Sequence, residues 1–246
     1  MVETNEMKVM SEIYFIRHGQ ASFGTSDYDR LSPIGIRQAR IVADHLAELG
    51  MGFDAIYSGR MKRQRDTARP LIQHHKELLP ERSQLNILEA LDEYDSRALL
   101  LARTRTSQAP DPLTTAEVLA LGQDRKAFQA YFSETVNRWL EGHYDKLEGI
   151  ETWPSFCRRV REGVEHLKNH HGRGSRLAVF TSGGPISVVV QMALGLGKGK
   201  ALELSWQIMN ASLTCIKYNA SGISLSVFNN TTPLLLSGDP ALLTYR

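Results

Sequence analysis

The segment Glu12-Ile-Tyr-Phe-Ile-Arg17, followed by His18-Gly19, decides how the rest of the chain is interpreted. Its run of aromatic and β-branched residues, bounded by a glycine, predicts a buried strand over 12–17. In open parallel sheets, ligands bind outside the carboxyl ends of the strands. The strand therefore delivers Arg17 and His18 to the place where a ligand site is expected.

Helices and strands alternate downstream of this segment. Ser32-Pro33 is typical of a helix start, and apolar residues then recur at helical spacing up to Gly50. A short strand is predicted over 53–57, and a basic helix over 60–73. The order strand, helix, strand, helix predicts an α/β fold with a parallel sheet.

The C-terminal half repeats this pattern. The continuous apolar run over 176–181 predicts another buried strand, and Ser182-Gly-Gly-Pro185 separates it from a predicted helix over 186–196. The segments 213–218 and 223–228 flank a short turn sequence and predict a closing hairpin.

The whole chain, 1–246, is expected to form one domain. Its predicted architecture is a three-layer αβα sandwich: a mostly parallel sheet with helices on both faces. A helical insertion over about 96–147, with a capping-box pattern at Thr114-Thr-Ala-Glu117, is expected to lie over the C-terminal strand ends. Residues 1–10 are expected to form a flexible tail.

Composition and charge exclude several classes of protein. A net charge of +2 over 246 residues argues against a nucleic-acid partner, and two cysteines argue against a disulfide scaffold or a thiolate zinc cluster. The N-terminus lacks the basic and apolar regions of a secretory signal, and the longest apolar stretch, 186–196, is far below the ~20 residues of a membrane span. We therefore expect a cytoplasmic protein that uses neither a membrane nor a metal ion.

Residues suited to binding phosphate gather at the predicted strand ends. Arg17 and His18 close the first strand, Arg63 follows the second, and Ser182-Gly-Gly184 closes a later one. A guanidinium matches phosphate oxygens, and glycines before a helix expose backbone N–H groups that favour an anion. An imidazole beside such a phosphate can attack phosphorus as a nucleophile. The sequence therefore predicts a phosphate pocket with a histidine in it.

The same residues form part of a longer pattern. Its pieces follow one another in order: Tyr14-Phe-Ile-Arg-His-Gly-Gln20, Leu31-Ser-Pro-Ile-Gly35 with Gln38-Ala39, and Tyr57-Ser58 with Arg63 and Thr67-Ala68. In these pieces the chain resembles the histidine phosphatase superfamily, also called phosphoglycerate-mutase-like, from about Glu12 to Arg246.

The resemblance implies a role for each matching residue. His18 would be the phosphorylated nucleophile, Arg17 and Arg63 would hold the phosphoryl oxygens, and no cofactor would be needed. Ser182, Gly183 and Gln20 complete the expected phosphate-binding set.

The resemblance also implies a proton-donating glutamate downstream, and two candidates exist. Glu93 in Leu91-Asp-Glu93 resembles the family's Leu-Asn-Glu segment, while Glu89 belongs to a looser match. We favour Glu93. Its task requires a carboxyl whose pKa is raised toward neutrality, and burial against the insertion would raise it.

Two departures from the family pattern affect the expected chemistry. Ser182 stands where the family usually has a second histidine, so a neutral donor replaces a cation and the reaction should be slower. Phe23-Gly24 stands where the mutases of the family carry Trp-Asn. Losing phosphate anchors argues against retaining the phosphoryl group for return to substrate, so hydrolysis is favoured.

Three kinds of function fit these observations. The favoured one is a phosphatase that hydrolyses a phosphate monoester through a phosphohistidine. A catalytically weak or inactive phosphate-binding or scaffolding relative is the alternative that Ser182 suggests, and a mutase is third. Each would take a small phosphorylated molecule as its partner, and no motif specifies which phosphate ester it is or the oligomeric state.

Overall fold

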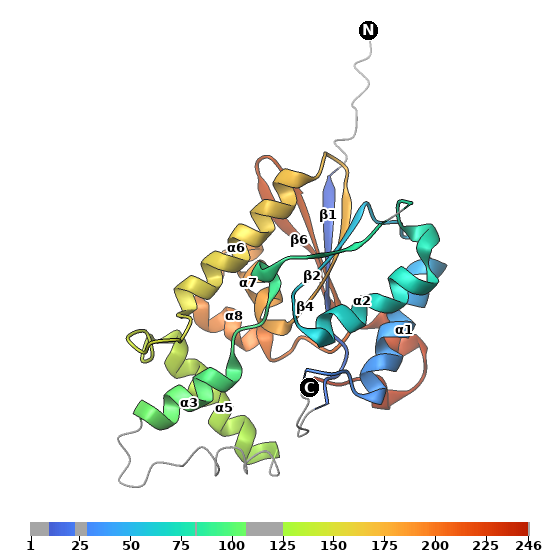
Figure 1. The fold of residues 1–246 in the computed structure, drawn as a ribbon. Coiled ribbons are helices and arrows are strands. Elements are labelled where there is room, and N and C mark those ends of the chain that lie inside the picture. Colours follow the sequence, from blue (N-terminus) through green and yellow to red (C-terminus); the bar gives the residue numbers. More distant parts are fainter. Residues whose placement is uncertain (1–9, 23–28, 82, 107–124, 246) are drawn as a thin grey trace.

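The computed structural model describes residues 10–22, 29–81, 83–106 and 125–245, and a six-stranded sheet forms its centre (Figure 1). The strand order is β3-β2-β4-β1-β5-β6. Strands β1, β4, β2 and β3 run parallel, β5 is antiparallel to β1, and β6 is antiparallel to β5. The strands are β1 (Ser11–Arg17), β2 (Ala55–Ser58), β3 (Leu85–Ile87), β4 (Arg176–Thr181), β5 (Leu213–Asn219) and β6 (Gly222–Asn230). The predicted parallel sheet and closing hairpin are confirmed.

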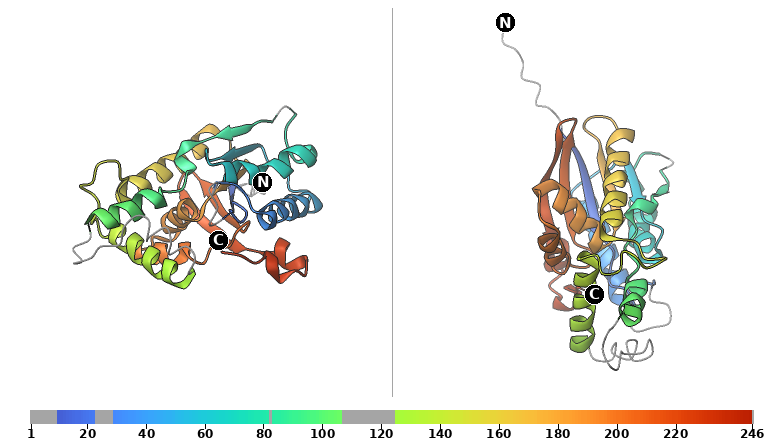
Figure 2. Two further views of the ribbon diagram at one scale, coloured as in Figure 1. Left: turned by 60° about the horizontal axis from the view of Figure 1, so that its bottom comes forward. Right: turned by 90° about the vertical axis from the view of Figure 1, so that its left-hand side faces the viewer.

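Helices lie on both sides of this sheet (Figures 1 and 2). They are α1 (Pro33–Glu48), α2 (Lys62–His74), α3 (Ser96–Thr106), α5 (Arg125–Leu140), α6 (Trp153–His170), α7 (Gly183–Leu194), α8 (Lys198–Ser205) and α9 (Thr232–Leu236). The described residues also form the short 3-10 turns η1 (Lys76–Leu78), η2 (Glu89–Leu91) and η4 (Pro240–Leu242). Among the described residues, no helix has both the length and the apolar character that crossing a membrane requires.

Alternation along the strands divides the apolar core into two layers. On β1, Ile13 and Phe15 belong to a cluster with buried side chains of α6 and α7, whereas Ile16 belongs to a second cluster with those of α1 and α2. All three side chains have no exposed surface. Since neighbouring strand residues point to opposite faces, both faces of the sheet are covered, and the predicted three-layer sandwich is confirmed.

The predicted insertion contributes α3 and α5, which lie beyond α6 and α8 at the end of the molecule toward which β1 runs (Figure 1). Trp139 of α5 is buried in the same apolar cluster as residues of α6 and α7, so the insertion packs onto this side of the sheet's core. The capping-box pattern at 114–117 and the proposed tail, except residue 10, lie outside the described residues.

Three local predictions differ from the structure. The helix predicted over 186–196 begins at Gly183 and ends at Leu194, because proline is tolerated in a first helical turn. Gly195 ends it in a left-handed conformation with φ 64°, and α8, which was not predicted, follows almost at once. The short strand β3 was not predicted, because the alternation in Leu85-Asn86-Ile87 is too short to indicate a strand.

Candidate active site

His18 lies directly after β1 and is 5% exposed. Its Nδ1 lies 2.8 Å from the carbonyl oxygen of Gly19, which can only accept a hydrogen bond. Its Nε2 lies 3.1 Å from Nε of Arg63, which can only donate one. The two contacts assign the neutral tautomer with the proton on Nδ1, so the lone pair of Nε2 faces the guanidinium.

Burial lowers the pKa of His18 well below its ordinary value, and the positive charges of Arg63 and Arg17 lower it further. The hydrogen bond to the Gly19 carbonyl opposes this shift and is the weaker effect. The imidazole is therefore neutral at neutral pH, which is the state a nucleophilic nitrogen requires.

Arg63 reaches His18 from the first turn of α2, and Asp29 holds it there. The Asp29 carboxylate accepts from Nη1 of Arg63 at 2.7 Å and from the backbone N–H of Lys62 at 2.7 Å. The helix has no side-chain cap of its own at Met61, so Asp29 also satisfies one of its free N–H groups. Asp29 was not predicted, because its partners lie more than thirty positions further along the chain.

The loop after His18 is fixed by close packing against α1 and α2. The N–H of Gly19 donates to Thr67 Oγ1 at 3.0 Å. A Cβ atom on Gly19 would lie 2.4 Å from the carbonyl oxygen of Gly35, so only glycine permits this approach. The next residue, Gln20, accepts from Ser32 Oγ at 2.8 Å and donates its N–H to Gln38. These hydrogen bonds join Gln20 to α1 and to the serine that caps it, and neither joins it to His18.

Arg17 and the start of α7 form the other side of the site. Nη1 of Arg17 donates to the carbonyl oxygen of Ile208. A Cβ atom on Gly183 would lie 3.8 Å from Nε of Arg17, so the guanidinium lies against the first turn of α7. Ser182, which precedes this turn, is fully buried. The structure therefore brings the end of β1 and the end of β4 together, as their parallel pairing through Arg17 and Thr181 requires.

The two candidate glutamates lie in different environments. The side chain of Glu89 is 64% exposed and pairs with Arg60 at 2.9 Å. The carboxylate of Glu93 instead accepts from the backbone N–H of Gly184 at 3.1 Å and from that of Tyr94 at 3.2 Å. Of the two, only Glu93 reaches the N-terminus of α7 beside Ser182.

Burial raises the pKa of Glu93, and this effect exceeds the opposing hydrogen bond from Gly184 and the charges of Arg63 and Arg17. The adjacent Tyr94 packs on Trp139 of α5, with ring centroids 4.9 Å apart, and edge-on against Phe156 of α6 at 5.6 Å. Aromatic side chains from the insertion and from α6 thus pack beside Glu93 and help to shield its carboxyl from water.

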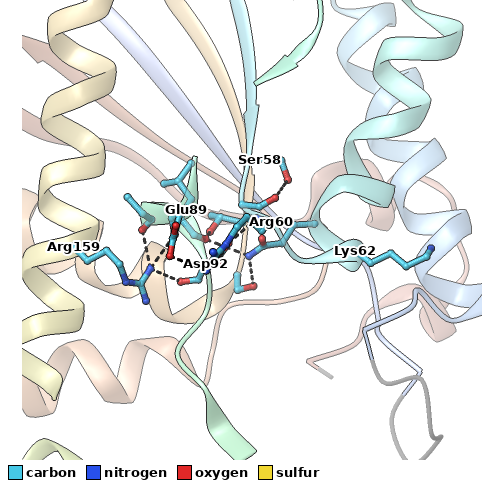
Figure 3. A network of polar contacts seen from close by, with 12 residues as sticks. Ser58, Arg60, Lys62, Glu89, Asp92 and Arg159 are labelled. Atoms are coloured by element: carbon cyan, nitrogen blue, oxygen red, sulfur yellow. Dashed lines mark hydrogen bonds and ion pairs between the residues drawn. The ribbon is translucent and has the colours of Figure 1, made fainter. Parts of the chain in front are cut away.

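The turn that carries Glu93 is held from two sides (Figure 3). From one side, Asp92 accepts from both the backbone N–H and the guanidinium of Arg60, at 2.6 and 2.7 Å. From the other, Arg159 of α6 donates to the carbonyl oxygens of Glu89, Ala90 and Asp92 at 3.1–3.2 Å. Glu151 accepts twice from Arg159 at 2.8 Å and so holds this guanidinium in place.

The predicted site residues therefore fall into two groups. Six of them surround the carboxyl ends of β1 and β4: His18, Arg63, Arg17, Glu93, Ser182 and Gly183. Gln20 instead contacts Ser32 and Gln38. The Phe23-Gly24 departure lies outside the described residues. Among the residues that the structure describes, no cluster of His, Cys, Asp and Glu side chains could hold a metal ion.

A neutral buried histidine, two arginines whose charges act on it and a protonatable buried carboxyl are the kinds of groups that phosphoryl transfer uses. The sequence matches the model of the histidine phosphatase superfamily (branch 1) over residues 13–109 and 119–231, and the chain belongs to this family. No curated protein matches the sequence.

Solved structures share the fold at low sequence identity. A phosphoglycerate mutase from Bacillus anthracis is 16% identical, with a TM-score of 0.64, and the match covers 94% of this chain and 98% of that one. A mutant phosphoserine phosphatase from Entamoeba histolytica, in complex with phosphoserine, is 18% identical at a TM-score of 0.59, covering 92% and 100%. The mycobacterial glucosyl-3-phosphoglycerate phosphatase is 20% identical at a TM-score of 0.57, covering 89% and 98%.

Proposed function

We propose that this protein is a phosphatase that hydrolyses a small phosphate monoester through a phosphohistidine at His18. The observation that carries the proposal is the state of His18: it is neutral, protonated on Nδ1, and its Nε2 lone pair faces Arg63 at 3.1 Å. A bound phosphoryl group would take the place of that contact and meet the lone pair directly. Arg63 and Arg17 would then bind its oxygens.

In the first step, Nε2 of His18 attacks phosphorus, the N–P bond forms and the ester P–O bond breaks. Glu93 gives its proton to the departing oxygen, for which its raised pKa suits it. The imidazole gains positive charge, and its Nδ1–H keeps donating to the Gly19 carbonyl at 2.8 Å. The arginines stabilise the charge that is spread over the phosphoryl oxygens.

In the second step, Glu93 takes a proton from water as the water oxygen attacks phosphorus. The N–P bond breaks, inorganic phosphate leaves, and both His18 and Glu93 return to their starting protonation states. This sequence needs neither a metal ion nor an organic cofactor. The phosphorylated ligands named for the family's solved structures, among them phosphoserine, support a small phosphorylated molecule as the substrate class.

The test is hydrolysis of an aryl phosphate and of a panel of phosphorylated metabolites, combined with rapid quenching. An acid-labile, base-stable phosphoryl group should be trapped on wild type and be absent from His18→Ala. The control is His74→Ala, which removes an exposed histidine on α2. A phosphoryl group trapped on another residue would refute the assignment, and phosphate binding without any turnover would favour the non-catalytic alternative.

A further inference from the structure

The hydroxyl of Ser182 is held in an unusual way for a serine that precedes a helix. Ser32 accepts from the N–H three residues ahead, at Gly35, and so caps α1 at 3.1 Å. Ser182 makes no such cap on α7. The residue three ahead of it is Pro185, which has no N–H, and the N–H of Gly184 already donates to Glu93. The local sequence therefore leaves the Ser182 hydroxyl available for a different partner.

That partner is Gln64 of α2. Its Nε2 donates to Ser182 Oγ at 2.8 Å and to the carbonyl oxygen of Leu91 at 3.3 Å. Since the Leu91 carbonyl can only accept, the amide must present its NH2 group on this side. Ser182 Oγ is thus an acceptor toward Gln64, and among the described residues its own hydrogen has no acceptor.

Gln64 occupies this position at a cost to its own hydrogen bonding. It has no exposed surface, and its Oε1 has no hydrogen-bond partner among the described residues. A Cβ atom on Gly59 would lie 2.1 Å from that oxygen, so the glycine at 59 makes room for the amide. A buried polar atom without a partner is costly, so the position of this amide needs an explanation. The contacts of its NH2 group indicate that it orients Ser182.

We infer that Gln64 is a positioning residue that fixes Ser182 as a hydrogen-bond donor to the phosphoryl group. The inference rests on the proposed function, and it concerns how the site works without a second histidine. The Gln64 amide occupies a lone pair of Ser182 Oγ, and the hydroxyl hydrogen is left for a phosphoryl oxygen between Arg17 and Arg63. An amide is required, because a carboxylate at 64 would accept that hydrogen and withdraw it from the ligand.

A double-mutant cycle tests this inference with Gln64→Met, Ser182→Ala and the double variant. The readouts are kcat with an aryl phosphate and the affinities for inorganic phosphate and vanadate. Each single variant should lose about 5–10-fold in kcat and in vanadate affinity, as expected for one neutral hydrogen bond. The double variant should lose no more than Ser182→Ala alone. Gln73→Met, an exposed glutamine on the same helix, should match wild type.

Additive losses would show that Gln64 acts independently of Ser182, and an unaffected Gln64→Met would show that it does not act at all; either result overturns the inference. Gln64→Glu covers the case in which Gln64→Met does not fold, and it should lose more than Ser182→Ala, since its carboxylate accepts the serine hydrogen. Wild-type vanadate affinity in Gln64→Glu would also overturn it. Because the phosphate arm needs no turnover, coupling in binding without hydrolysis would refute the proposed function alone.

Discussion

Gly184→Ala should disable the reaction without touching His18 or either arginine, because the new methyl group would collide with Glu93. A Cβ atom at 184 would lie 2.0 Å from Glu93 Oε1 and 3.1 Å from Cζ of Phe156. The carboxyl oxygen must therefore retreat by about 1.4 Å, the difference between 2.0 Å and the 3.4 Å at which ordinary contact begins, and Phe156 limits where it can go. The retreat would also weaken the 3.1 Å hydrogen bond from the Gly184 N–H to the carboxylate.

A misplacement of about 1 Å can cost about 100-fold in rate, and a general acid contributes about 10²–10⁴-fold. We therefore expect kcat with an aryl phosphate to fall by about 100-fold, while the affinity for inorganic phosphate stays near that of wild type. Alanine is the better helix former by ~1 kcal/mol, so the variant should fold. Its thermal midpoint should be compared with that of Gly199→Ala, where a Cβ atom on α8 meets nothing within 4 Å.

A second substitution separates crowding from any general effect of the methyl group. Glu93→Asp withdraws the carboxyl by one methylene and should restore part of the lost rate in the Gly184→Ala background, although alone it lowers the rate. If Gly184→Ala keeps the wild-type kcat and the wild-type pH profile, Glu93 is not the proton donor at this position and the reasoning fails.

The remaining predictions concern the other charged groups of the site. Arg63→Ala should weaken the binding of inorganic phosphate by about 1.5–3 kcal/mol, which is the contribution of a charged hydrogen bond. Arg65→Ala, on the same helix, should leave phosphate binding unchanged. Equal losses of affinity in a calorimetric titration would mean that only the charge of the helix matters. The log kcat/KM of wild type should stay high below pH 6.5, the ordinary pKa of histidine, because His18 remains neutral there, and it should fall on the alkaline side as Glu93 loses its proton above its raised pKa. Glu93→Gln should be slower and should lack the alkaline fall. An alkaline fall that persists in Glu93→Gln would assign it to another group. Arg159→Met should lower kcat by up to about 100-fold by loosening the turn before Glu93, while the affinity for inorganic phosphate stays unchanged. A loss of both kcat and phosphate affinity would indicate general unfolding.

The fold was predictable where local pattern and tertiary environment agree. The apolar run over β1 and β4 predicts buried strands, and their shared direction places Arg17 beside Thr181 in the parallel register. The start of α7 was misplaced because Gly183 and Gly184 disfavour a helix by propensity. The structure compensates for this through a contact that local sequence cannot reveal: the Gly184 N–H donates to Glu93, 91 positions earlier.

The candidate site divides in the same way. Arg17 and His18 end a strand and Arg63 begins a helix, so their meeting follows from topology alone. Asp29, Gln64 and Arg159 were not predicted, since each acts on the site through partners 27 to 118 positions away, and the choice of partner depends on packing between elements. An aspartate in a loop or a glutamine after an arginine has no local spacing that distinguishes it from a surface residue.

The serine at 182 is consistent with the protonation state of Glu93. The Glu93 carboxylate accepts a hydrogen bond from the N–H of Gly184, two residues after Ser182. Burial raises the pKa of Glu93, although the positive charges of Arg63 and Arg17 act to lower it. A third cation at 182 would stabilise the carboxylate and lower that pKa. Exchanging a charged donor for a neutral one costs about 1 kcal/mol in phosphate binding, while a shift of one pKa unit is worth about 1.4 kcal/mol. In the proposed reaction, a neutral donor at 182 would therefore give up some affinity for the phosphoryl group and would keep Glu93 protonated over a wider pH range.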